Sequence, residues 1–142
     1  MTETTEPKEE QQEQRKPTVI VADDEPHLRV LMRSIMRSMG IDIVGEAKNG
    51  KEAVEMWREF HPDLLLLDVN MPLMDGEDVL KEIMQDDEDA FVIMLTSVSD
   101  LGTVEKCVDL GASNYIRKDT PIPEIKKLIR TTWTEVKSGG GA

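Results

Sequence analysis

Residues 64–76 of the 142-residue chain read LLLLDVNMPLMDG, a run of four leucines followed by an aspartate and several turn-forming residues. A short, continuous apolar run is typical of a strand that is covered on both faces, as in a parallel sheet. Asp68 follows the run directly, and the Asn, Pro, Asp and Gly residues beyond it favour a loop. The stretch therefore predicts a buried strand with a carboxylate at its carboxyl end.

Four further apolar runs flank this strand, at residues 19–22, 43–44, 91–95 and 115–116. Each of the five runs is followed by a segment in which apolar residues recur at spacings of three and four, which predicts amphipathic helices. Pro26 suits the first turn of the first helix, Gly40 suits its C-terminal cap, and Asp75 suits an N-terminal cap of the third. The predicted stripes are Leu28, Leu31, Met32, Ile35, Met36 and Met39; Ala53, Val54, Trp57 and Phe60; Val79, Leu80, Ile83 and Met84; Val104, Cys107 and Val108; and Ile125, Leu128, Ile129 and Val136.

Five strand-then-helix units predict an α/β fold, a doubly wound five-stranded parallel sheet flanked by five helices. Residues 1–17 carry no apolar residue after Met1, so we expect a disordered tail there. Residues 18–137 form the predicted domain, and the Gly-rich residues 138–142 are expected to be a flexible tail. The sequence has no secretory signal and no apolar run long enough to span a bilayer, which predicts a cytoplasmic protein.

The formal net charge of −12 disfavours binding to nucleic acid or to an anionic membrane. The charge is unevenly distributed along the chain. Residues 18–114 carry −13, whereas residues 115–142 carry +3. This asymmetry points to a basic surface near the C-terminus that is suited to an acidic protein partner.

Polar residues follow four of the five predicted strands, namely Asp23, Asp24, Asp68, Thr96 and Lys118. Because ligands of open α/β sheets bind beyond the carboxyl ends of the strands, these side chains should converge on one rim. Three neighbouring carboxylates repel one another unless a cation neutralises them, and Mg²⁺ prefers such oxygen ligands together with a phosphate. Thr96 and Lys118 can bind phosphoryl oxygens, and Asp68 is the predicted nucleophile for phosphorus.

The motifs VADDEP (21–26), LLLLDVNMPLMDG (64–76), MLTS (94–97) and GASNYIRK (111–118) occur in an order that resembles the response-regulator receiver family, above all its single-domain, CheY-like members. The resemblance covers residues 18–136. It implies a flavodoxin-like fold with strand order 2-1-3-4-5. It also implies a stand-alone response regulator of two-component signalling, a phosphoprotein rather than an enzyme.

By this resemblance, Asp68 accepts a phosphoryl group from a histidine kinase or a histidine phosphotransfer protein. Asp23 and Asp24 hold Mg²⁺ together with Asp68 and the backbone carbonyl of Asn70. The resemblance makes Thr96 and Lys118 the phosphoryl-binding residues, and Thr96 and Tyr115 the switch residues. A downstream protein would bind at the fourth helix, fifth strand and fifth helix.

The chain departs from the family at Asp119, because family members usually have proline directly after the lysine. A cis bond before a non-proline residue costs about 2.5–4 kcal/mol, so we expect a trans bond or local strain after Lys118. Two alternatives remain open at this point. The protein could be an aspartyl-phosphate phosphotransferase or phosphatase, although Asn70 stands where such an enzyme usually has its general acid. It could also be a binding module that needs no phosphorylation.

Overall fold

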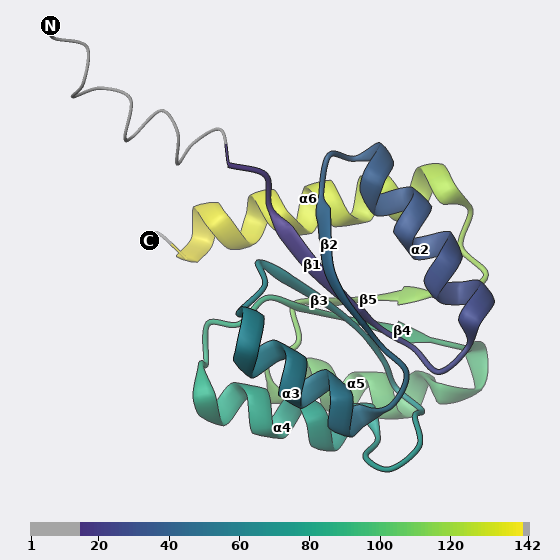
Figure 1. Ribbon diagram of the computed structural model, residues 1–142, viewed down its shortest axis with the longest axis vertical. Coiled ribbons are helices and arrows are strands. Elements are labelled where there is room, and N and C mark those ends of the chain that lie inside the picture. The colour runs from purple at the N-terminus through teal and green to yellow at the C-terminus, as the bar shows by residue number, and fades with distance from the viewer. Residues whose placement is uncertain (1–14, 141–142) are drawn as a thin grey trace, which may run out of the picture.

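The computed structural model describes residues 15–140, apart from the side chains of Val98 and residues 138–140. Strands and helices alternate along this part of the chain (Figure 1). The strands are β1 (Thr18–Ala22), β2 (Asp42–Ala47), β3 (Leu64–Asp68), β4 (Val92–Thr96) and β5 (Asn114–Arg117). The helices are α2 (Pro26–Ser38), α3 (Gly50–Phe60), α4 (Gly76–Asp86), α5 (Leu101–Leu110) and α6 (Ile122–Gly140), with a short 3₁₀ turn at Val98–Asp100.

The five strands form one parallel sheet in the order β2-β1-β3-β4-β5. Helices α2 and α6 cover one face of this sheet, and α3, α4 and α5 cover the other (Figure 1). Every residue of β3 and β4 is buried, because both strands lie inside the sheet with helices on both sides. The predicted fold class, strand order and number of helices are confirmed.

The ends of the helices follow the predicted signals. Asp75 caps α4, since its Oδ1 accepts a hydrogen bond of 3.0 Å from the backbone N–H of Asp78. Gly40 follows α2 with a φ of 77°, the left-handed conformation that glycine adopts without a steric penalty. These local signals fix where each helix begins or ends relative to the sheet.

Two predicted core residues lie at the surface instead. Phe60 is 46% exposed because it is the last residue of α3, and Val108 is 43% exposed because α5 buries only Val104 and Cys107. Conversely, Trp133 of α6 packs against Phe91 with ring centroids 5.3 Å apart, although the predicted stripe omitted it. No helix in the described part of the chain has the length and apolarity that a membrane crossing requires.

Contacts at the N-terminal side and helix α6 at the C-terminal side reach past the predicted domain bounds, which stay a prediction. Arg15 forms an ion pair of 3.3 Å with Asp63, and Lys16 lies 3.9 Å from Asp42, although both cations belong to the predicted N-terminal tail. Helix α6 runs to Gly140, past the predicted end of the domain at residue 137. The prediction for residues 1–14 and 141–142 lies outside the described residues.

Candidate functional site

The carboxyl edge of the sheet brings the predicted acidic residues together. Asp23 and Asp24 follow β1, and Asp68 is the last residue of β3, which pairs with β1. Carboxylate oxygens of these three residues lie within 4.8 Å of one another. The loop after Asp68 is tightly folded, because a Cβ on Gly76 would collide with the backbone carbonyl oxygen of Asp68. The sheet register and this glycine therefore position the acidic cluster.

Lys118 joins the acidic residues into one ionic network. Its Nζ lies 3.2 Å from Asp68 Oδ2 and 3.0 Å from Asp23 Oδ2. It also donates a hydrogen bond of 2.8 Å to Glu25 Oε1. The lysine follows β5, and its backbone N–H donates a hydrogen bond to Thr96 O at 2.8 Å, which anchors it at the edge of the sheet. The predicted convergence of Asp23, Asp68 and Lys118 thus occurs.

The donor set fits a hard divalent cation. Asp24 is exposed and Asp68 lines a solvent-open cleft of about 480 Å³, whereas Asp23 is fully buried. Asp23 Oδ1 accepts a hydrogen bond of 2.9 Å from the Glu25 N–H, while Oδ2 accepts none from the described residues and has only the ion pair with Lys118. A buried carboxylate oxygen without a hydrogen bond is costly, and a cation satisfies it.

The environment of Asp68 keeps its carboxyl group from ionising easily. Burial, followed by the negative charge of Asp23, raises the pKa of Asp68 to about 7, although Lys118 partly offsets both effects. The pKa of Lys118 is also raised, which favours the charged form of this side chain. Burial alone would lower its pKa, but the hydrogen bond with Glu25 and the negative charges of Asp23 and Asp68 raise it well above the usual value. Lys118 therefore remains a cation at neutral pH.

Two predicted site residues, Thr96 and Tyr115, lie apart from this ionic cluster, whereas Asn70 belongs to it. Thr96 is fully buried, and its hydroxyl donates a hydrogen bond of 2.8 Å to Ser97 O rather than lining the cleft. Tyr115 is 38% exposed and lines a different groove, between β5 and α6. Asn70 does line the cleft, and its N–H donates a hydrogen bond of 3.2 Å to Asp68 Oδ1.

Two acidic members of the site, Glu25 and Asp100, were not predicted from the sequence. Glu25 binds Lys118, and this contact lowers the pKa of Glu25. Asp100 accepts hydrogen bonds from Asn70 Nδ2 at 2.7 Å and from Ser97 Oγ at 2.9 Å, which closes the cleft on the α5 side. The position of Glu25 directly after the acidic pair in VADDEP could have indicated its role. Nothing in the local sequence marks Asp100.

The residue that replaces the usual proline has its own partner. Asp119 Oδ2 accepts a hydrogen bond of 2.7 Å from Arg117 Nη2, an exposed ion pair on the loop after β5. No described residue follows a cis peptide bond, so the bond between Lys118 and Asp119 is trans, one of the two expected outcomes. Lys118 reaches the acidic cluster with this trans bond in place.

Comparison with known proteins agrees with the fold. Residues 19–130 match the model of the response regulator receiver domain family. The chemotaxis protein CheY of Halobacterium salinarum is 38% identical over 116 residues, which is 82% of this chain and 96% of that protein. The CheX–CheY–BeF₃–Mg complex of Borrelia burgdorferi matches with a TM-score of 0.77 and 29% identity over 82% of this chain and 88% of the other. The chain belongs to the response-regulator receiver family.

Members of this family also occur within larger enzymes. A protein-glutamate methylesterase/protein-glutamine glutaminase of Methanococcoides burtonii is 36% identical over 122 residues, which is 84% of this chain but only 34% of that protein. The similarity therefore covers about a third of the methylesterase. It supports the presence of a receiver domain in this chain.

Proposed function

We propose that the protein is a stand-alone response regulator that accepts a phosphoryl group on Asp68 from a histidine kinase or a histidine phosphotransfer protein. The observation that carries this proposal is the contact of Asp68 with Lys118 inside a cleft rimmed by Asp24. In the transfer, a carboxylate oxygen of Asp68 attacks phosphorus, and the bond from phosphorus to the donor nitrogen breaks. The donor keeps that electron pair and takes up a proton.

Each residue of the site has a definite task in this reaction. Asp23, Asp24, Asp68 and the carbonyl of Asn70 would hold Mg²⁺, whose chemistry when bound is to offset charge on the transferring phosphoryl oxygens. Lys118 supplies a fixed positive charge beside Asp68. Thr96 contributes only after its hydroxyl turns away from Ser97 O, so we assign the proposed switch to that rotation.

The output surface that we propose consists of α5, β5 and α6. Exposed apolar side chains of α5 and β5, among them Val108, Leu110 and Tyr115, lie on these elements. A groove of about 700 Å³ runs between β5 and α6 and is lined by both Tyr115 and the exposed Lys127. A downstream protein with an acidic or amphipathic segment would suit this mixture of apolar and basic groups.

Two alternatives receive less support. A phosphotransferase or phosphatase would need a general acid near Asp68, but Asn70 carries an amide that is already bonded to Asp100. A binding module without phosphorylation would not explain why Asp68, Lys118 and the acidic cluster share one cleft. The cytoplasmic location expected from the sequence stays a prediction.

Beryllofluoride, a mimic of the phosphoryl group, tests the proposal without any partner protein. We expect beryllofluoride with Mg²⁺ to shift the backbone amide resonances of Asp68, Thr96 and Tyr115 in the ¹⁵N-labelled chain. The Asp68→Asn variant should show none of these shifts, because the amide cannot coordinate beryllium as a carboxylate does. Identical spectra of the native chain with and without beryllofluoride would contradict the proposal.

A further inference from the structure

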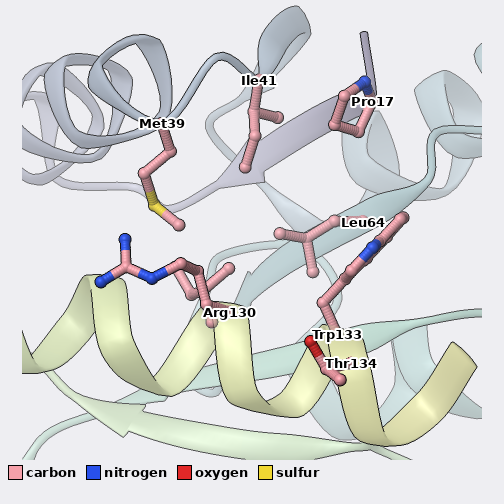
Figure 2. A pocket seen from close by; sticks show the side chains of 8 residues that line it. Pro17, Met39, Ile41, Leu64, Arg130, Trp133 and Thr134 are labelled. Atoms are coloured by element: carbon pink, nitrogen blue, oxygen red, sulfur yellow. The ribbon is translucent and has the colours of Figure 1, made fainter. Parts of the chain in front are cut away.

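A second cavity lies at the amino edge of the sheet, opposite the acidic cluster. It has a volume of about 230 Å³ and is lined by Pro17, Met39, Ile41, Leu64, Ile129, Arg130, Trp133 and Thr134. Figure 2 shows the two sides of this space. Arg130, Trp133 and Thr134 of α6 lie on one side. On the other side lie Pro17 before β1, Met39 and Ile41 before β2, and Leu64, the first residue of β3. Six of the eight lining residues are apolar, so the cavity favours an apolar occupant.

The size and stiffness of the cavity indicate a single large side chain. Sites for small molecules usually measure about 300–1,000 Å³, so a cavity of 230 Å³ is small for a cofactor. Its Trp133 wall is held from two sides, by the ring of Phe91 at 5.3 Å and by Lys137 Nζ at 4.6 Å from the ring centroid. A preformed apolar pocket with a fixed aromatic wall is typical of the anchor points of protein interfaces.

Arg130 gives the cavity its charge. Its exposed side chain extends along the cavity toward Met39 (Figure 2), and no described residue forms an ion pair with it. Two other cations near this edge have carboxylate partners, because Arg15 pairs with Asp63 and Lys16 with Asp42. In a protein of net charge −12, an arginine with no described carboxylate partner beside an apolar cavity favours an acidic ligand.

We propose that this cavity binds an acidic segment of a partner protein, with one large apolar side chain in the cavity and a neighbouring carboxylate paired with Arg130. The chain's own residues 1–14 are acidic, but after Met1 they contain no large apolar side chain that could fill the space. The cavity lies at the opposite edge of the sheet from Asp68, so a segment bound there leaves the acidic cleft open.

A capped synthetic peptide, Glu-Asp-Phe-Glu-Asp, provides the probe. The chain has only two tryptophans, so the indole N–H signal of Trp133 can be assigned with a Trp57→Phe variant and followed by NMR. We expect a saturable shift of this signal with a Kd below about 1 mM, weakened by salt. A peptide with alanine in place of phenylalanine should leave the signal unchanged.

Variants of the protein separate the parts of the proposal. Arg130→Glu should weaken binding at least about tenfold, a change of about 1.4 kcal/mol. Ile41→Phe should also weaken binding, because the larger side chain fills the cavity while Arg130 keeps its charge. Lys51→Glu is the matched control, since Lys51 is an exposed cation of α3 on the other face of the sheet, and this variant should bind the peptide as tightly as the native chain does. Asp68→Asn should also bind normally, which separates this site from the proposed phosphorylation.

Three results would overturn the proposal. The first is the absence of a saturable Trp133 shift at millimolar peptide. The second is an equal loss of affinity in the Lys51→Glu and Arg130→Glu variants, because the peptide would then respond only to the overall charge of the protein. The third is association of the protein with itself, seen by sedimentation and abolished by Arg130→Glu, because the occupant would then be a second copy.

Discussion

Lys118 Nζ lies 3.2 Å from Asp68 Oδ2, although 50 residues separate the two in the sequence. The contact joins the ends of β3 and β5, on either side of β4. It places a cation against a carboxyl group whose burial raises its pKa to about 7. The free energy of unfolding and the reactivity of Asp68 therefore both depend on how this charge is balanced.

The raised pKa of Asp68 predicts that the metal-free protein loses stability as the pH rises. Between about pH 4 and pH 7 the folded state retains a proton on Asp68 that the unfolded chain releases, so the free energy of unfolding falls across this window. Asp68→Asn should remove this contribution and be more stable than the native chain at pH 8 by about 2–4 kcal/mol. Urea denaturation in EDTA at pH 5 and pH 8 measures the difference.

Added Mg²⁺ provides the control for this prediction. A bound divalent cation favours the ionised carboxylate, so added Mg²⁺ should reduce the loss of stability toward pH 8 in the native chain. It should not change the pH profile of the Asp68→Asn variant. Parallel pH profiles of the two proteins in EDTA would show that Asp68 does not carry the raised pKa.

Asp24→Asn should weaken the binding of Mg²⁺ by about tenfold or more, because it removes one of three charged oxygen ligands. Asp24 is exposed, so the fold should tolerate the change. Titration calorimetry with MgCl₂ measures the affinity. Asp109→Asn is the matched control, since Asp109 is an exposed acid on α5 outside the cluster. Equal losses in the two variants would mean that Mg²⁺ responds only to net charge.

Thr96→Ala should uncouple the site from the proposed output surface. The hydroxyl that now donates to Ser97 O is the group that must turn toward a phosphoryl oxygen, and its loss removes that link while Asp68 and Lys118 remain. Tyr115 is the only tyrosine in the sequence, so its ring signals report on β5 without ambiguity. With beryllofluoride and Mg²⁺ they should shift in the native chain but not in Thr96→Ala. Equal shifts would assign the coupling to another residue.

Replacement by alanine should have opposite effects on stability at two glycines, Gly76 and Gly102. Gly76→Ala should destabilise the fold by at least about 2 kcal/mol, because the new Cβ would collide with the backbone oxygen of Asp68. Gly102→Ala, within α5, meets no atom within 4 Å and should stabilise the protein by about 0.5–1 kcal/mol. Thermal unfolding of both variants tests the claim that Gly76 holds the loop against Asp68.

The sequence predicted the fold well because its signals are local. The leucine run of β3, the glycine after α2 and the Asp75 cap each act within a few residues, and the structure contains all three. Burial at helix ends was less predictable. Phe60 falls on the correct helical stripe but lies at the end of α3, where it remains half exposed.

The site was predictable in its residue types but not in its contacts. Parallel strands bring their carboxyl ends to one edge, so Asp23, Asp68 and Lys118 could be grouped without a structure. The partners of Lys118 depend on how a long side chain crosses the edge of the sheet, and Glu25 was therefore missed. The orientation of the Thr96 hydroxyl depends on a rotamer that the sequence pattern does not determine.

Intact mass spectrometry after incubation with acetyl phosphate and Mg²⁺ tests the central claim most directly. The native chain should gain the mass of one phosphoryl group, and the gain should be absent in EDTA and in Asp68→Asn. Tandem mass spectrometry, or trapping of the acyl phosphate by borohydride reduction, should locate the modification at Asp68. A native chain that gains no mass, or an Asp68→Asn variant that gains it equally, would contradict the account.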